Sequence, residues 1–135
     1  MTVQALHLVA LAAWFGVVAV ESVIELLPLR RPELAAAAAT FHFWIDLLVE
    51  LPLLLGVLVT GGLLLRGQTL DTELGIKVAA GGAAIVMNLC CVAFVIARHR
   101  GGAELRSRRT RLVFATATVG MPLGLVALWI GLGRM

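Results

Sequence analysis

Residues 34–65 read LAAAAATFHFWIDLLVELPLLLGVLVTGGLLL, an almost unbroken apolar run. A helix of this length spans about 48 Å at 1.5 Å per residue, more than the roughly 30 Å of a bilayer's hydrocarbon core. Three further apolar runs cover about 3–29, 74–97 and 112–132. Each exceeds the length that separates a spanning helix from a buried core helix. The sequence therefore predicts four transmembrane helices.

The composition agrees with this prediction. Hydrophobic residues make up 61% of the 135 residues and charged residues 14%, whereas a soluble domain has about 45–50% and about 25%. The mean hydropathy is +1.01. These values exclude an ordinary soluble domain and a disordered chain, and two cysteines exclude a disulfide scaffold. We expect an all-α, integral membrane four-helix bundle of up-down-up-down topology, with residues 1–135 as a single transmembrane domain.

The basic residues predict the orientation in the membrane. Eight of the eleven lie in the connection between the first two spans or in a basic loop expected over residues 98–111: Arg30, Arg31, Arg98, Arg100, Arg106, Arg108, Arg109 and Arg111. Basic loops face the cytoplasm, so both termini are expected on the other side of a bacterial-type inner or plasma membrane. We expect the 98–111 loop to contact anionic lipid. A nucleic-acid partner is not expected, because no aromatic residues interleave with these arginines.

Ionisable side chains lie inside the first two predicted spans, where lipid would penalise them. The first span carries two glutamates four residues apart, which share one helix face. The second carries a histidine and two acids, again four apart, which form a stripe over two turns. These residues are Glu21, Glu25, His42, Asp46 and Glu50.

The two stripes are expected to meet, because the first two spans are antiparallel and joined by a short turn. Residues whose numbers sum to about 63 or 64 then lie at equal depth along the two helices. Glu21 pairs with His42 or Phe43, and Trp14 lies level with Glu50. The same arithmetic for the second and third spans places Asn88 opposite Glu50. The prediction is one polar cluster in the inner half of the membrane, with Glu50 nearer the midplane.

The negative charges of this cluster need a counter-charge. Each ionised acid at mid-span opposes insertion by about 2.5–3.5 kcal/mol, so the four together oppose it by on the order of 10 kcal/mol. His42 supplies at most one positive charge, and neither span contains a lysine or arginine at that depth. Protons, water or bound cations must balance the rest. Imidazole and carboxylates suit divalent or transition metals, so we predict a site for Zn, Fe, Mn or Cu whose ligands are Glu21, Glu25, His42, Asp46 and Glu50.

Other functions use the same residues without a metal. One is acid–base catalysis on a lipophilic small molecule by an isomerase or cyclase, with Glu21, Asp46 and Glu50 as catalytic residues. Trp14, Phe43 and Asn88 would then line the substrate pocket. Another is a proton-coupled carrier that uses the acids as a relay. A polar network that only holds helices together is the structural alternative, and the oligomeric state, including a homo-oligomer, is left open.

Several weaker signals leave their roles open. His7 lies at heptad spacing from Trp14, near the outer surface. The neighbouring Cys90 and Cys91 lie in the third span, close to Met87. Sulfur ligands select copper(I), but buried cysteine and methionine also pack as ordinary apolar residues. The sequence does not decide whether these residues take part in a site.

The first span resembles a known family. Leu6-His7-Leu8-Val9-Ala10-Leu11-Ala12-Ala13-Trp14-Phe15-Gly16 is similar to the first helix of copper-resistance D-type membrane proteins, which often read His-Leu, small apolar residues and Trp-x-Gly. The resemblance covers this helix only. It implies copper handling and a role for His7 on the outward side.

Overall fold

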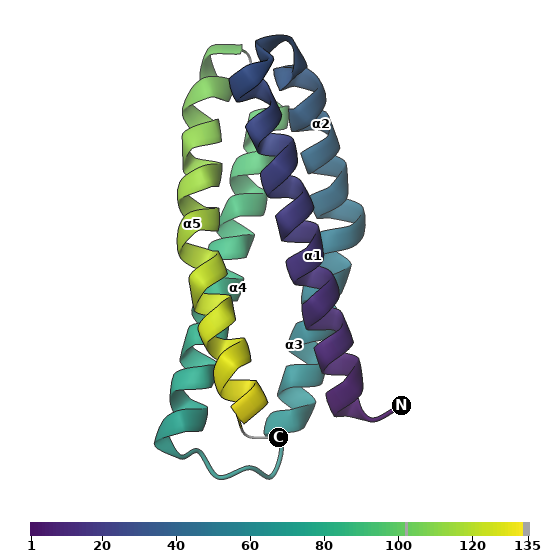
Figure 1. The fold of residues 1–135 in the computed structure, drawn as a ribbon, viewed down its shortest axis with the longest axis vertical. Coiled ribbons are helices and arrows are strands. Elements are labelled where there is room, and N and C mark those ends of the chain that lie inside the picture. The colour runs from purple at the N-terminus through teal and green to yellow at the C-terminus, as the bar shows by residue number, and fades with distance from the viewer. Residues whose placement is uncertain (102, 134–135) are drawn as a thin grey trace. The chain divides into compact units, whose positions relative to one another are not determined.

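The computed structural model describes the backbone of residues 1–101 and 103–133 and the side chains of residues 1–101 and 109–133. Every regular element in the described part is helical, and the chain divides into two compact units, Met1–Gln68 and Thr69–Met135. Each unit is a helical hairpin (Figure 1). The two are called hairpin 1 and hairpin 2 below.

Hairpin 1 pairs one straight helix with a second helical segment that changes its winding. The straight helix α1 spans Val3–Arg30, and the Thr2 side chain caps it by accepting a hydrogen bond from the backbone of Ala5 at 3.2 Å. The chain reverses through a 3₁₀ turn over Pro32–Leu34. The returning segment consists of α2 (Ala35–Ile45), the π-helix η2 (Asp46–Glu50) and α3 (Leu51–Leu65).

Hairpin 2 consists of α4, which spans Thr72–His99, and α5, which spans Ala103–Gly133. The side chain of Asp71 caps α4 by accepting a hydrogen bond from the backbone N–H of Leu74 at 2.8 Å. The two helices pack along each other (Figure 1). Small and β-branched residues are buried along this hairpin, among them Ala84, Val92 and Val113, as expected where membrane helices approach closely.

Four helical segments are long and apolar enough to cross a membrane: Val3–Arg30, Pro32–Leu65, Thr72–His99 and Arg109–Gly133. They match the four spans predicted from the sequence. Many leucine and valine side chains on these helices are exposed, such as Leu55 and Val86. Exposed apolar side chains suit contact with lipid. The prediction of an all-α protein with four helices capable of spanning a membrane is confirmed.

The prediction of a basic loop over residues 98–111 is wrong. Arg98 and His99 form the last turn of α4, and α5 begins at Ala103, so most of that segment is helical. Alanine, leucine, arginine and glutamate have high helix propensity, and this propensity extends α5 beyond the apolar run. The side chains of Arg106 and Arg108, two of the arginines predicted to contact lipid, lie outside the described residues.

The interior of hairpin 1 is unusually polar. Ten of its residues are buried, and five of these are ionisable: Glu21, Glu25, His42, Asp46 and Glu50. Acidic residues are almost never fully buried unless they are paired. Hairpin 1 therefore exposes many of its leucine and valine side chains while five ionisable side chains lie in its interior, and this interior contains the candidate site.

A candidate metal site inside hairpin 1

The structure brings the two predicted stripes together. Glu21 and Glu25 lie one turn apart on α1, His42 lies on α2, and Asp46 and Glu50 begin and end η2. All five side chains are buried, and no more than 5% of the surface of any of them is exposed. The facing stripes predicted from residue spacing and depth are thus present as one buried line of ionisable groups.

The π-helix explains how the second stripe stays in line. Four residues of an α-helix overshoot a full turn by about 40°, so two such steps would rotate Glu50 about 80° away from His42. In η2 the backbone N–H of Leu51 bonds to the carbonyl of Asp46, five residues earlier. This wider turn holds more residues, so the step from Asp46 to Glu50 drifts the opposite way. The two rotations are of opposite sign and largely cancel, so the side chains of His42, Asp46 and Glu50 all face the interior.

Proline at position 52 accounts for the place of this wide turn. Its ring has no N–H to donate and clashes with the carbonyl four residues earlier in a regular helix. The sequence analysis did not predict a π-helix. Such turns are frequent at functional sites, and this one lies next to the charged cluster.

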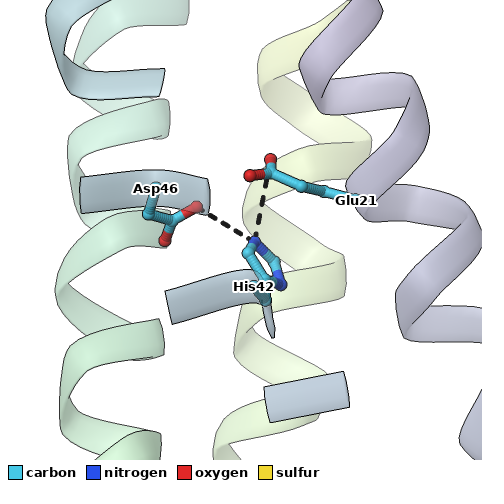
Figure 2. Close-up of side chains that lie close together, drawn as sticks. All are labelled: Glu21, His42 and Asp46. Carbon is cyan, nitrogen blue, oxygen red and sulfur yellow. Dashed lines mark ion pairs between the residues drawn. The ribbon is translucent and has the colours of Figure 1, made fainter. Parts of the chain in front are cut away.

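His42 is the centre of the cluster. Its Nε2 atom lies 3.3 Å from Oδ1 of Asp46 and 3.8 Å from Oε2 of Glu21. Figure 2 shows these two carboxyl groups converging on the same ring nitrogen from α1 and from the returning segment. One ligand atom from each of the three residues lies within 4.8 Å of the other two. An imidazole nitrogen and two carboxylate oxygens therefore surround one small region.

Glu25 occupies the opposite side of the imidazole ring. Its Oε1 atom lies 2.5 Å from Nδ1 of His42, and both side chains are buried. An ionised carboxylate can only accept a hydrogen bond, so an ionised Glu25 requires the proton on Nδ1. On a neutral imidazole of that tautomer, the lone pair of Nε2 faces Glu21 and Asp46. Metal-binding histidines are commonly oriented by a carboxylate in this manner.

The acids beside Nε2 lack hydrogen-bond donors. Among the described residues, neither oxygen of Asp46 has a hydrogen-bond partner, and neither does Oε1 of Glu21. All three atoms are buried. Buried polar atoms are hydrogen-bonded in the great majority of cases, and an unpaired buried charge is far more costly than a neutral group. These oxygens therefore require a positive or proton-donating partner.

The spacing of the three atoms suits a metal ion. Zinc binds histidine nitrogen and carboxylate oxygen at about 2.0–2.2 Å, so two adjacent ligand atoms lie roughly 3.0–3.6 Å apart. The Nε2–Oδ1 distance of 3.3 Å falls in that interval, and the Nε2–Oε2 distance of 3.8 Å slightly exceeds it. The three ligand atoms lie within 4.8 Å of one another, so the group must contract around an ion for all three atoms to bind it.

Glu50 lies level with Trp14, as predicted, but the structure gives Trp14 a different role. The indole Nε1–H of Trp14 donates a hydrogen bond to Oε1 of Glu50 at 3.1 Å. Trp14 was predicted as a wall of a substrate pocket, and its role as a donor was not foreseen. Equal depth along the antiparallel helices was the signal that could have revealed it.

The remaining predicted residues lie apart from this contact. Phe43 is half-buried, with its ring edge-on to that of Trp44 at 5.2 Å between centroids. Asn88 belongs to hairpin 2, so its pairing with Glu50 stays a prediction. Nδ1 of His7 lies 2.8 Å from the hydroxyl of Thr60, a partner that the sequence analysis missed.

The sulfur-containing residues also belong to hairpin 2. Cys90 is exposed, and Cys91 is half-buried with its sulfur 4.0 Å from the carbonyl of Val113. Met87 packs beside Gly120. The only metal-type cluster among the described residues is that of Glu21, His42 and Asp46, so sulfur ligation stays a prediction without geometric support.

Fold and site together define an α-helical protein whose hairpins are long and apolar enough to span a membrane and which has a buried histidine–carboxylate cluster near metal-binding geometry. Comparison with known proteins finds no matching family model, no similar curated protein and no similar solved structure. The resemblance of the first helix to copper-resistance D-type proteins therefore stays a prediction.

Proposed function

We propose that this chain is an integral membrane protein that binds a divalent or transition metal ion inside hairpin 1. Glu21, His42 and Asp46 would supply the ligand atoms. Glu25 would orient the imidazole, and Glu50 would lie beside the site, held by Trp14. This divides the five ligands predicted from the sequence into three that bind the ion and two that support them.

One observation carries the proposal. Nε2 of His42 and oxygens of Asp46 and Glu21 converge within 4.8 Å, and the acids have buried oxygen atoms without hydrogen-bond partners among the described residues. A cation would balance two negative charges and occupy the lone pairs of all three groups at once. Intramembrane ionisable residues of this kind usually mark ion pathways, relays or binding sites.

The donor atoms favour hard and borderline metals. Carboxylates suit manganese, and imidazole suits zinc, iron, nickel and copper(II), whereas copper(I) selects sulfur. Hairpin 1 contains no cysteine, and its one methionine is the first residue. Zinc, iron and manganese are therefore our first candidates. The copper handling implied by the family resemblance would require copper(II) at this site.

We further propose that Arg30, Arg31 and the arginines near the connection between α4 and α5 face the cytoplasm. The basis is the excess of basic residues at those two chain reversals, because basic segments near membrane helices remain on the cytoplasmic side. Anionic lipid would interact with them by charge attraction.

Metal analysis of the detergent-purified protein tests the proposed site. We expect about one metal ion per wild-type chain by plasma mass spectrometry, and loss of that ion in Glu21→Gln and Asp46→Asn. Glu33→Gln is the matched control, because it makes the same change at an exposed acid in the turn of hairpin 1. The control should retain the ion.

The opposite result has a defined meaning. Absence of a stoichiometric metal, together with a melting temperature that chelators leave unchanged, would refute the metal site. Protons would then have to balance the acids, as a metal-free acid–base enzyme or a proton-coupled carrier requires. A co-purified apolar molecule detected by mass spectrometry would support the enzyme, and potential-dependent proton flux into liposomes would support the carrier.

A further inference from the structure

Hairpin 1 brings only three ligand residues to the candidate ion, although five ionisable groups line its interior. Glu25 contacts the far nitrogen of His42 at 2.5 Å, so it lies across the ring from Nε2. Glu50 accepts a hydrogen bond from Trp14. The ligand atoms that lie within 4.8 Å of one another come from Glu21, His42 and Asp46, and this group presents one nitrogen and two carboxylates to the ion.

Three protein ligands are characteristic of reactive metal sites. Structural zinc sites are closed by four protein ligands, whereas catalytic sites have three and bind water or substrate at the fourth position. Two chemical features agree with the open type here. Oε1 of Glu21 and both oxygens of Asp46 receive no hydrogen bond that would hold them in a closed shell, and no sulfur ligand is present among the three residues.

The second oxygens of the two acids provide independent evidence for an additional ligand. If Glu21 and Asp46 each bind the ion through the oxygen nearer His42, then Oε1 of Glu21 and Oδ2 of Asp46 remain buried without partners among the described residues. A water molecule on the ion has two hydrogens to donate. It would satisfy both oxygens while each carboxylate binds the ion through a single oxygen.

We propose, on the basis of the metal site proposed above, that the ion retains a coordination position for an exchangeable, non-protein oxygen or nitrogen donor. Water occupies that position at rest, hydrogen-bonded to the free oxygens of Glu21 and Asp46. A small anion, or the polar group of an apolar substrate, replaces it. The site is therefore a ligand-binding centre of the Lewis-acid type, not a structural clamp between α1 and the returning segment.

Cobalt(II) loading followed by azide titration tests this inference, because the visible spectrum of cobalt reports its coordination. The detergent-purified full chain is loaded with cobalt, freed of excess metal and titrated with sodium azide. We expect a saturable spectral change in the wild type and the same change in Glu33→Gln. Asp46→Asn should bind at least tenfold less cobalt, which shows that the signal comes from this site.

Two further variants ask whether Glu25 or Glu50 fills the remaining position. Glu25→Gln and Glu50→Gln should each retain an azide-dependent change when loaded with cobalt. If the wild type binds cobalt without responding to azide, and one of these variants gains the response, that acid is a fourth ligand and the inference is wrong.

X-ray absorption of the zinc-loaded protein provides a readout that does not depend on azide reaching the site. We expect one imidazole and more light donor atoms than three residues supply through single atoms. A shell of only three light donor atoms would overturn the open position while leaving the metal site intact. Failure of the wild type to bind either metal would overturn the proposed function, and the open position with it.

Discussion

Glu25→Gln provides a quantitative test of how the imidazole is positioned. The glutamate oxygen lies 2.5 Å from Nδ1 of His42, and the two side chains are about 4% exposed. Glutamine retains a carbonyl acceptor at the same position but removes the negative charge. The amide therefore preserves the shape of the contact while weakening its electrostatic part, since a charged acceptor makes a hydrogen bond roughly twice as strong as a neutral one.

The size of the effect follows from the role of Glu25. Mutations of groups that orient a metal-binding histidine typically reduce metal affinity about 10–100-fold, which corresponds to about 1.4–2.8 kcal/mol. The burial of this contact places the expectation in the upper half of that interval. Glu25→Leu should lose more affinity, because it leaves Nδ1–H without its acceptor in an apolar environment.

Competition against a chromophoric chelator in detergent measures the affinity, with Glu33→Gln as the charge-matched control. Circular dichroism establishes that each variant retains its helices. The reasoning would be refuted if Glu25→Gln bound the ion as tightly as the wild type, because His42 would then need no carboxylate at Nδ1. Complete loss of binding in Glu25→Gln would also contradict it, because Glu25 would then be a ligand.

Three other outcomes test the surroundings of the site. Trp14→Phe should lower the free energy of unfolding by about 1–3 kcal/mol, because Glu50 loses its buried donor; thermal unfolding in detergent measures this, and an unchanged stability would contradict the contact. Deletion of Leu48 should return η2 to regular α-helical winding with Glu50 and α3 near their present rotation, because five residues of the wide turn and four residues of an α-helix each cover about one turn; the variant should therefore retain the bound ion, and loss of the ion would show that the wide turn itself shapes the site. Metal affinity should fall as the pH is lowered, because protons compete with the metal for the ligand atoms of His42 and the acids; a pH-independent affinity in the chelator competition would exclude these ligands.

Much of the candidate site follows from residue spacing. Steps of four residues place ionisable groups on one helix face. A short turn between antiparallel helices brings residues whose numbers add up to a constant sum to equal depth. These two rules predicted the meeting of Glu21 with His42, which the structure places 3.8 Å apart. They also placed Trp14 level with Glu50, and the structure joins the two by a hydrogen bond.

Prediction from the sequence failed where the outcome depends on the winding of a helix or on the residue at which a helix begins. Proline at position 52 disturbs regular helical hydrogen bonding, but a kink, a lost hydrogen bond and a π-helix are all compatible with it. The arginine-rich segment after His99 was assigned to a loop on charge alone. Its helix-forming residues continue α5 instead, since charge does not oppose a helix outside the hydrocarbon core.

The sequence by itself determined the class of protein, the number of helices able to span a membrane and the depth at which charged residues meet. Apolar run length and helical period are properties of whole segments, so they can be read from the sequence without knowledge of any tertiary contact. Only the tertiary structure decided that Glu25 binds the far side of His42, that Trp14 holds Glu50, and that Glu21 and Asp46 share Nε2. Those assignments depend on helix rotation and side-chain direction, which are set when two helices pack and vary over distances smaller than one helical turn.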